Sequence, residues 1–221
     1  MTDRDTDGRV LSHYEGYPYP ERDPRDEVRR LVTGSPSALF ELNHYVFGGA
    51  RDLTRPLDAL IAGGGTGDAA IMLAQQMKDA NVPGTVTHLD ISAPSQAIAR
   101  ARAEARGLDN LAFGEGSLLD VAALGLGPFD YIDCCGVLHH LEDPAAGLAA
   151  LAGALAPDGG IGLMVYGELG RSGVYDVQAM LRKLAPYGED DSARVEAARR
   201  LVAALPPTNR FARNPLLQDH R

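Results

Sequence analysis

The sequence is poor in cysteine: Cys134 and Cys135 are the only two among 221 residues. They are neighbours inside an apolar stretch, which excludes the disulfide framework of a small secreted protein. The first residues lack an apolar core, so no signal peptide is visible. No apolar run approaches the roughly 20 residues of a membrane-spanning helix; residues 145–156 come closest, but they are rich in alanine and end at Pro157. We therefore expect a cytoplasmic protein without a membrane partner.

Basic residues are outnumbered by acidic ones, 21 Lys and Arg against 30 Asp and Glu, which gives a net charge of -9. This balance disfavours the phosphate backbone of a nucleic acid as the main partner. The adjacent His139 and His140 would point apart on a turn or helix and make a poor metal pair, so we expect no metal. The hydrophobic share of 45% is ordinary, as in a globular α/β domain with or without a small appendage.

The rest of the chain is organised around one glycine turn. An apolar run, 57–62, leads into Gly63, Gly65 and Gly67, and a helical pattern follows from 68 to 81. Glycine permits positive φ and close backbone approach, and the start of a helix presents unpaired N–H donors. A buried strand, a glycine turn and a helix in this order are typical of a cradle for a nucleotide-like ligand.

Short apolar segments alternate with helical patterns along the middle of the chain. Strands are expected at 57–62, 85–90, 111–113, 131–135 and 161–166, and helices at 68–81, 93–106 and 145–156, with a tight turn at 157–160. Short strands separated by helices predict a parallel sheet covered on both faces, and right-handed crossovers make it doubly wound. The predicted fold class is α/β, with a doubly wound, mostly parallel, Rossmann-like sheet.

Three regions follow from this pattern. Residues 1–50 are expected to form an N-terminal arm and helical cap, with helices at 23–32 and 36–47, and residues 51–166 the ligand-binding domain. Residues 167–221 contain helical patterns and no closing β-hairpin. They are therefore either a helical appendage or the incomplete end of the same domain, cut short before its last strands.

An acidic residue, Asp90, ends the second predicted strand and follows Gly67 by 23 residues. A carboxylate at this place accepts hydrogen bonds from both hydroxyls of a ribose, in NAD and in S-adenosylmethionine alike. The run from Gly65 to Ala70 also satisfies the Gly-x-Gly-x-x-Ala dinucleotide fingerprint. On these features alone, the choice between the two cofactors is open.

Two further stretches separate the cofactors. Gly116-Ser117-Leu118 follows the third strand, and residues 136–141 after the fourth strand read Gly-Val-Leu-His-His-Leu. With these motifs in this order, residues 57–166 resemble the class I S-adenosylmethionine-dependent methyltransferases, in particular the subset that carries Gly-Val-Leu-His-His-Leu after strand four. The ordered combination is far more specific than any one motif.

The resemblance implies that the cofactor-binding residues lie in the loops after successive strands. They are Gly63, Gly65 and Gly67 for the methionine part and ribose, Asp90 for the ribose hydroxyls, Ser117 and Leu118 for the adenine, and Cys135 and Gly136 for the sulfonium end. The family usually carries an acidic residue two positions before the first glycine and another at the adenine amino group. This chain has Ile61 and Ser117 at those positions.

Methyl transfer from a sulfonium is an in-line displacement, so the enzyme mainly aligns the reactants and excludes water. No catalytic triad is needed. If the acceptor is an acid or an amine, a base helps, and the candidates are Tyr14, Tyr19 and His139. The segment 13–20, rich in tyrosine and proline, either packs its rings on the domain or forms a lid over the ligand.

The predicted function is therefore methyl transfer from S-adenosylmethionine to a small-molecule or protein acceptor, with no particular oligomeric state indicated. Two alternatives stay open. One is an NAD-dependent oxidoreductase, which rests on the glycine fingerprint and Asp90. The other is a non-catalytic, methyltransferase-like binding module.

Overall fold

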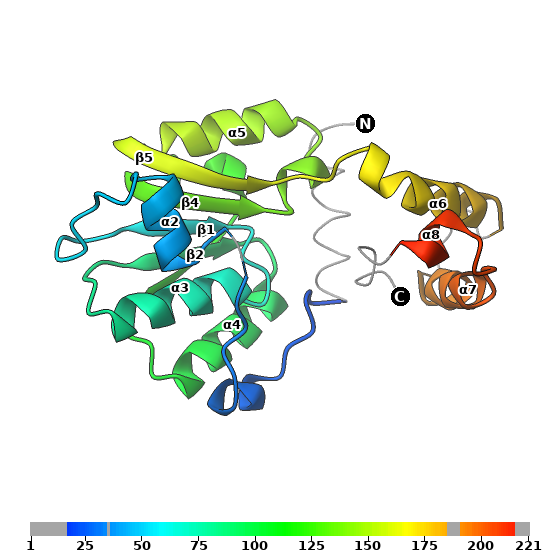
Figure 1. Cartoon of the computed structure of the whole chain (residues 1–221), viewed down its shortest axis with the longest axis horizontal. Helices are drawn as coiled ribbons and strands as arrows, with labels where there is room; N and C mark the ends of the chain where they lie inside the picture. Colours follow the sequence, from blue (N-terminus) through cyan, green and yellow to red (C-terminus); the bar gives the residue numbers. More distant parts are fainter. Residues whose placement is uncertain (1–16, 35, 185–190, 215–221) are drawn as a thin grey trace. The chain divides into compact units, whose positions relative to one another are not determined.

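The computed structural model describes residues 17–34, 36–184 and 191–214. By its contacts the chain divides into two compact units, Met1–Val165 and Tyr166–Arg221, and each is described by itself (Figure 1). The first unit contains the sheet and all the predicted cofactor-binding residues. The described part of the second unit is helical.

Within the described residues, the first unit holds one sheet of five strands in the order β3-β2-β1-β4-β5 (Figure 1). The strands are β1 (Ala59–Ala62), β2 (Val86–Asp90), β3 (Leu111–Glu115), β4 (Phe129–Cys135) and β5 (Leu155–Met164). Every neighbouring pair is parallel. The predicted doubly wound, Rossmann-like sheet is therefore confirmed, with β1 at its centre.

Helices connect the strands. They are α3 (Asp68–Asp79), α4 (Ala93–Ala105) and α5 (Pro144–Gly153), with the short 3-10 turns η2 (Leu118–Asp120) and η3 (Leu138–His140). Ser92 caps α4 by accepting a hydrogen bond from the Ser95 amide, and Asp143 caps α5 in the same way. These caps satisfy N–H groups that have no partner inside the helix.

Two hydrophobic cores lie on opposite faces of the sheet. The side chains of β1 alternate between them, since successive residues of a strand point to opposite faces. Ala59 and Ile61 pack with α3, whereas Leu60 and Ala62 pack with Leu151 of α5. All four residues of β1 are buried, as expected for the central strand of a sheet covered on both sides.

The N-terminal helices are shorter than predicted. Instead of a helix over 23–32, the structure has the 3-10 turn η1 (Pro24–Val28), and the predicted helix over 36–47 is α2 (Leu39–Tyr45). The only buried residue of η1 is Glu27. An apolar face that would hold a longer helix on the sheet is therefore missing from η1, because helices in proteins depend mainly on such packing.

The start of β5 also differs from the prediction, because Pro157 and the following glycines lie inside the strand rather than in a tight turn. Phe129 pairs with Leu155 and Tyr131 with Gly160. Over this interval β5 advances five residues (155 to 160) while β4 advances two (129 to 131). The extra residues of β5 form a bulge-like irregularity. This irregularity depends on the pairing with β4 and is not visible in the local sequence.

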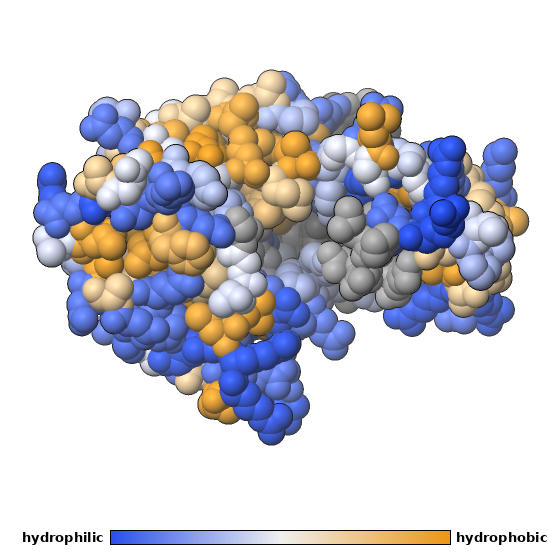
Figure 2. Space-filling view, in the orientation of Figure 1, coloured by the Kyte–Doolittle hydropathy of each residue, from blue (hydrophilic) through white to orange (hydrophobic). Residues whose placement is uncertain are grey.

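Apolar residues gather on one face over α5 and the end of β5 (Figure 2). Leu148, Leu163 and Met164 in this region are each more than a third exposed. Among the described helices, none is long and apolar enough to cross a membrane.

The second unit has its own small core. Its helices are η4 (Leu169–Arg171), α6 (Ser172–Leu184), α7 (Asp191–Ala203) and α8 (Arg210–Arg213). Val174 and Val177 of α6 pack against Phe211 of α8, and all three are buried. A short α-helix at 210–213 was not predicted; Asn209 caps it by accepting from the Phe211 amide.

Candidate cofactor site

The glycine turn lies between β1 and α3, at the carboxyl edge of the sheet. Gly63, Gly65 and Gly67 all have positive φ, at 73°, 53° and 100°, a backbone region that favours glycine. Gly63 and Gly65 are partly exposed at this edge, whereas Gly67 is buried. A Cβ on Gly67 would lie 2.9 Å from the Cβ of Ala99 on α4, so this glycine allows the two helices to pack closely.

Asp90 lies directly against the turn, as its place at the end of β2 predicts. Its Oδ2 accepts a hydrogen bond from the Gly65 amide at 2.7 Å, and its Oδ1 accepts one from the Ser92 amide at 2.8 Å. The residue is partly exposed, and each carboxylate oxygen has a further lone pair. The carboxylate therefore supports the turn and keeps capacity to accept bonds from ribose hydroxyls.

The imidazole ring of His88, on β2, also supports this turn. Its Nε2 lies 3.0 Å from the Gly65 carbonyl oxygen, and a Cβ on Gly64 would lie 2.5 Å from the ring. Burial lowers the pKa of His88, against the opposing effect of Asp90. The neutral ring donates from Nε2 to the carbonyl, which fixes the backbone of the turn.

The N-terminal segment around Tyr19 and Pro20 lies on the outer side of the turn. The Thr66 hydroxyl donates to the Pro20 carbonyl at 2.6 Å, and the Thr66 amide to the Tyr19 carbonyl at 3.4 Å. A Cβ on Gly65 would lie 2.6 Å from the Tyr19 oxygen. The contact is made by backbone, since the rings of Tyr17 and Tyr19 are about half exposed. Tyr14, a predicted candidate base, lies outside the described residues.

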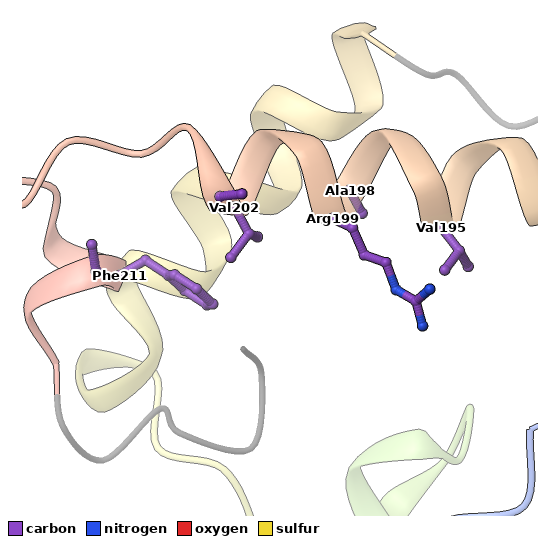
Figure 3. Close-up of a pocket in the computed structure, with 7 residues that line it drawn as sticks. Val195, Ala198, Arg199, Val202 and Phe211 are labelled. Atoms are coloured by element: carbon purple, nitrogen blue, oxygen red, sulfur yellow. The ribbon is translucent and has the colours of Figure 1, made fainter.

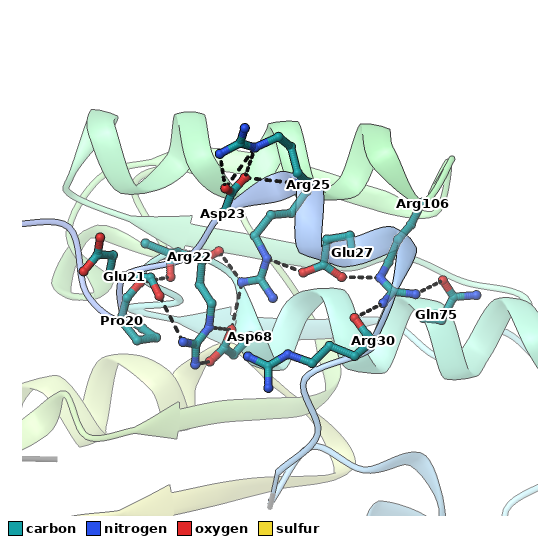
Figure 4. Close-up of polar contacts among 12 residues, drawn as sticks. Pro20, Glu21, Arg22, Asp23, Arg25, Glu27, Arg30, Asp68, Gln75 and Arg106 are labelled. Atoms are coloured by element: carbon teal, nitrogen blue, oxygen red, sulfur yellow. Dashed lines mark hydrogen bonds and ion pairs between the residues drawn. The ribbon is translucent and has the colours of Figure 1, made fainter. Parts of the chain in front are cut away.

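A buried ion-pair network fastens this segment to α3 and α4 (Figure 4). Arg102 of α4 is fully buried and donates to Glu27 at 2.6 Å, to Asp68 at 2.8 Å and to the Thr66 carbonyl at 2.7 Å. Arg22 donates to both oxygens of Asp68, at 2.8 and 2.6 Å. Burial alone would raise the pKa of Asp68, but the two guanidinium groups hold it below its usual value.

Glu27 joins the network from η1. It accepts from Arg102 and, through its second oxygen, from Arg106. Arg106 also donates to the Arg30 carbonyl at 2.6 Å and to Gln75 at 3.2 Å. Ion pairs thus hold both ends of the segment: the pair of Arg22 with Asp68 is partly exposed, and the pair of Glu27 with Arg102 is almost completely buried.

The loop after β3 meets the loop after β2. The Gly116 amide donates to the Asp90 carbonyl at 3.1 Å. Ser117 caps η2, its hydroxyl accepting from the Leu119 amide at 3.2 Å. Leu118 is buried in the core on the α5 side of the sheet. The structure therefore brings this loop to the Asp90 end of the site, while the adenine contacts of Ser117 and Leu118 stay a prediction.

Cys135 and Gly136 lie where β4 reaches the same edge. Gly136 has a φ of 80°, and its amide donates to the Met164 carbonyl at 2.9 Å. Cys135 is half-buried; burial and then the nearby Asp133 charge raise the pKa of its thiol to about 11. The thiol is therefore protonated at neutral pH and is a weak nucleophile.

The ring centroids of His139 and His140, on η3, are 4.3 Å apart.

One buried carboxylate near this edge was not predicted from the sequence. Asp133 of β4 is 2% exposed and accepts a hydrogen bond from the Ser37 hydroxyl. Burial raises the pKa of Asp133 to about 6, against the opposing effect of Ser37. On the same strand, the Tyr131 hydroxyl donates to the Pro36 carbonyl at 3.1 Å. These bonds fasten the segment before α2 to the sheet.

A separate cavity of about 700 Å³ lies in the second unit (Figure 3). It is lined by Val195, Ala198, Arg199, Val202, Ala203, Phe211 and Ala212. All of these belong to α7, α8 or the segment between them. None of the predicted cofactor-binding residues lines this cavity.

The arrangement in the first unit defines a class of protein. A parallel sheet whose central strand ends in a glycine turn, with a carboxylate from the next strand against that turn, is the architecture of nucleoside-cofactor domains. Asp90 ends β2, and the predicted glycines, Gly116 and Gly136 lie in loops that leave the same carboxyl edge of this one sheet.

The family follows from comparison with known proteins. Residues 60–161, just under half of the chain, match the family model described as a methyltransferase domain. The predicted membership of the class I S-adenosylmethionine-dependent methyltransferases is thereby confirmed. A Synechococcus protein of uncharacterised function is 38% identical over 212 residues, which are 92% of this chain and 48% of the relative. The chain thus spans about half the length of this relative.

Solved structures agree in fold. PKMT2 from Rickettsia typhi, solved in complex with AdoHcy, has a TM-score of 0.57 and 20% identity over 84% of this chain and 36% of that one. The YcgJ protein from Bacillus subtilis has a TM-score of 0.50 and 19% identity over 72% of this chain and 66% of that one. At these identities the likeness establishes the shared fold.

Proposed function

We propose that this chain transfers a methyl group from S-adenosylmethionine to a small-molecule or protein acceptor. The family match over residues 60–161 supports this function, as does the AdoHcy bound to the Rickettsia relative of the same fold. The observation that carries the proposal is the contact of the Asp90 carboxylate with the Gly65 amide at 2.7 Å. It supports the proposal because a carboxylate beside the glycine turn can accept the hydrogen bonds of a ribose, as a nucleoside cofactor requires.

The residues present fit this cofactor. Gly63 and Gly65 offer a partly exposed backbone with no side chain, and Asp90 keeps free acceptor capacity. Cys135 and Gly136 lie at the same carboxyl edge of the sheet, where β4 ends next to β5. The family match does not favour an NAD-dependent oxidoreductase, the alternative that the glycine fingerprint left open.

When bound, the cofactor supplies a methyl group that its sulfonium already activates. The chain then has to hold the donor, orient the acceptor along the line of displacement and exclude water. Asp90 and the glycine turn serve the first task, and His88 and Arg102 keep the turn rigid through the Gly65 and Thr66 carbonyls. Tyr14, Tyr19 and His139 stay candidates for a base that takes the acceptor proton.

Isothermal titration with S-adenosylmethionine tests the cofactor assignment. We expect Asp90→Ala to weaken binding at least tenfold, because two hydrogen bonds to a charged acceptor are lost. Asp109→Ala, which removes an exposed carboxylate elsewhere, is the matched control and should bind like the wild type. Asp90→Asn, which can still accept from the Gly65 amide, checks that the loss is not a collapse of the turn. Equal affinity of Asp90→Ala and wild type would contradict the ribose role.

Turnover distinguishes an enzyme from a binding module. A methyl-donor assay over pools of metabolites and peptides should reveal an acceptor, with formation of S-adenosylhomocysteine as the readout. Binding of the cofactor without turnover on any pool would instead support the non-catalytic module. Addition of NADH with fluorescence detection is the corresponding test of the oxidoreductase alternative, and we expect no change.

We also propose a cytoplasmic location and partners that are not nucleic acids. The two free thiols, Cys134 and Cys135, support the location, and the net charge of -9 supports the absence of a nucleic-acid partner. Cell fractionation tests the location. A gel-shift measurement with duplex DNA and RNA at low salt tests the partner, and a retarded band would contradict the proposal.

A further inference from the structure

The proposed function assigns no role to the buried carboxylate of Asp133, which lies in the sheet near the proposed cofactor site. On one side its strand partner is Ile61 of β1, and on the other it is Gly162 of β5. Ile61 lies two residues before Gly63, the first residue of the glycine turn. Asp133 lies two residues before Cys135 on the same face of β4, since side chains alternate along a strand. The carboxylate is therefore about 7 Å below the edge where the cofactor is proposed to bind.

This charge has no cationic partner among the described residues. Glu27, also buried, is paired with Arg102 and Arg106. Asp133, by contrast, makes no ion pair within the parts of the chain that the structure describes. Its hydrogen bonds come from the Ser37 hydroxyl and the Cys135 backbone, which are neutral donors.

The other titratable groups around Asp133 do not supply a positive charge either. On β4 they are Tyr131 and Cys135, whose pKa values are both raised, chiefly by burial. From α2, Glu41 contributes a further negative charge near Tyr131. On the flanking strands the partners are Ile61 and Gly162, which have no charge. A negative charge held in a low-dielectric site without a cation acts strongly on any cation that arrives nearby.

We propose that Asp133 is the counter-charge for the sulfonium of the cofactor, and that Ser37 holds its carboxylate in place. This inference rests on the proposed function. S-Adenosylmethionine carries the positive sulfonium, whereas the product S-adenosylhomocysteine has a neutral thioether at the same atom. Asp133 therefore makes the site prefer the methyl donor over the spent product, which promotes exchange of one for the other after each turnover.

Asp133 is a positioning residue here, because it lies below the edge and acts through its field. The positive charge on sulfur disperses as the methyl group leaves, so the carboxylate stabilises the bound donor more than the transition state. Such an interaction lowers KM and does not raise kcat. For Asp133→Asn we expect the KM for S-adenosylmethionine to rise about tenfold while kcat stays at or above its wild-type value.

Affinities for three ligands test the proposal without any acceptor. Isothermal titration compares S-adenosylmethionine, S-adenosylhomocysteine and methylthioadenosine, which keeps the nucleoside and thioether but lacks both the sulfonium and the amino acid. In Asp133→Asn the ratio of the first two affinities should fall about tenfold, and methylthioadenosine should bind as to the wild type. Asp130→Asn is the matched control, because Asp130 lies at the other end of β4 and is paired with Arg51.

Three results would overturn the inference. An unchanged ratio in Asp133→Asn would remove the sulfonium role, and an equal loss for donor and product would assign the carboxylate to the ammonium group instead. The same ratio in Asp130→Asn and Asp133→Asn would show a general charge effect. Failure of the proposed function looks different, because the wild-type protein would then bind neither donor nor product.

The wild-type protein offers a second measurement should Asp133→Asn fold poorly. Protonation of the carboxylate removes its charge, so the preference for donor over product should weaken between pH 7 and pH 5, across the pKa of about 6. A preference that is constant over this range would contradict the inference.

Discussion

The buried negative charge of Asp133 lowers the stability of the fold, although the proposed role of this residue depends on that charge. Its pKa of about 6 in the folded protein lies above the ordinary value of 3.8. Between these two pH values the folded state binds more protons than the unfolded state, so stability falls as the pH rises through this window. Above pH 6 the fold carries the full cost of a buried charge. Such a cost is often retained at functional sites.

We expect Asp133→Asn to be more stable than the wild type at pH 7, by up to about 3 kcal/mol. Well below pH 3.8 the two proteins should be equally stable, because the carboxyl is then protonated in both the folded and the unfolded state. Chemical denaturation at pH 4, 5.5 and 7 measures the difference. A variant that is less stable at pH 7 would show that the Ser37 bond outweighs the buried charge.

Gly65 is the glycine of the turn whose added Cβ would lie closest to a backbone atom rather than to a side chain. Its φ is 53°, and a Cβ would lie 2.6 Å from the Tyr19 carbonyl oxygen. We expect Gly65→Ala to lower the free energy of unfolding by about 1–3 kcal/mol. Gly153→Ala is the control, because nothing lies within 4 Å of its added Cβ and its φ is ordinary. That variant should be neutral or slightly more stable, and similar losses in both would refute the steric argument.

At the scale of elements, η1 is held by charge rather than by apolar packing. Removal of Glu27 leaves Arg106 without its carboxylate partner and Arg102 with Asp68 alone, and the loss of a partner is costly for a buried charge. We expect Glu27→Ala to destabilise the protein by about 3–5 kcal/mol. Arg25→Ala breaks the exposed Asp23–Arg25 pair of the same turn and should leave stability nearly unchanged, because water screens an exposed ion pair. Thermal and urea unfolding distinguish the two.

The elements that the sequence predicted well are those with strong local signals. β1 has a continuous apolar run, α3 follows a glycine turn, and Ser92 marks the start of α4. The predicted start of β5 was wrong because proline and glycine normally indicate a turn. Only the pairing with β4 reveals a strand there. Contacts between residues that are distant in sequence also limited what could be predicted about the site.

Asp90 was predictable because its position relative to the glycine turn is set by one strand–helix–strand unit. His88 and Asp133 were not, since their roles come from contacts with Gly65 and Ser37 that are distant in sequence. Arg102 was hidden for the same reason: in a helix with many charged residues, nothing local shows which arginine faces inward.

At the scale of the whole molecule, two units with separate cores should lose structure separately. Phe211 is 3% exposed and packs with Val174 and Val177. Replacement of such a buried phenylalanine by alanine costs about 3–5 kcal/mol, more than a small helical core is expected to supply. We expect Phe211→Ala to lose hydrogen-exchange protection in α6 and α7 while β1 and β4 keep theirs. Loss of protection in the sheet would show that the two units unfold together.

The ion-pair network has a practical consequence for anyone who trims this protein. The recognisable methyltransferase domain begins at residue 60, yet the partners of Asp68, Arg102 and Arg106 lie between residues 22 and 30. A fragment cut to the borders of the sequence family would keep the Asp68–Arg102 pair but discard Arg22 and Glu27, and Arg106 would lose its carboxylate partner. The smallest piece that folds should therefore start before Tyr19, some forty residues upstream of where the family match begins.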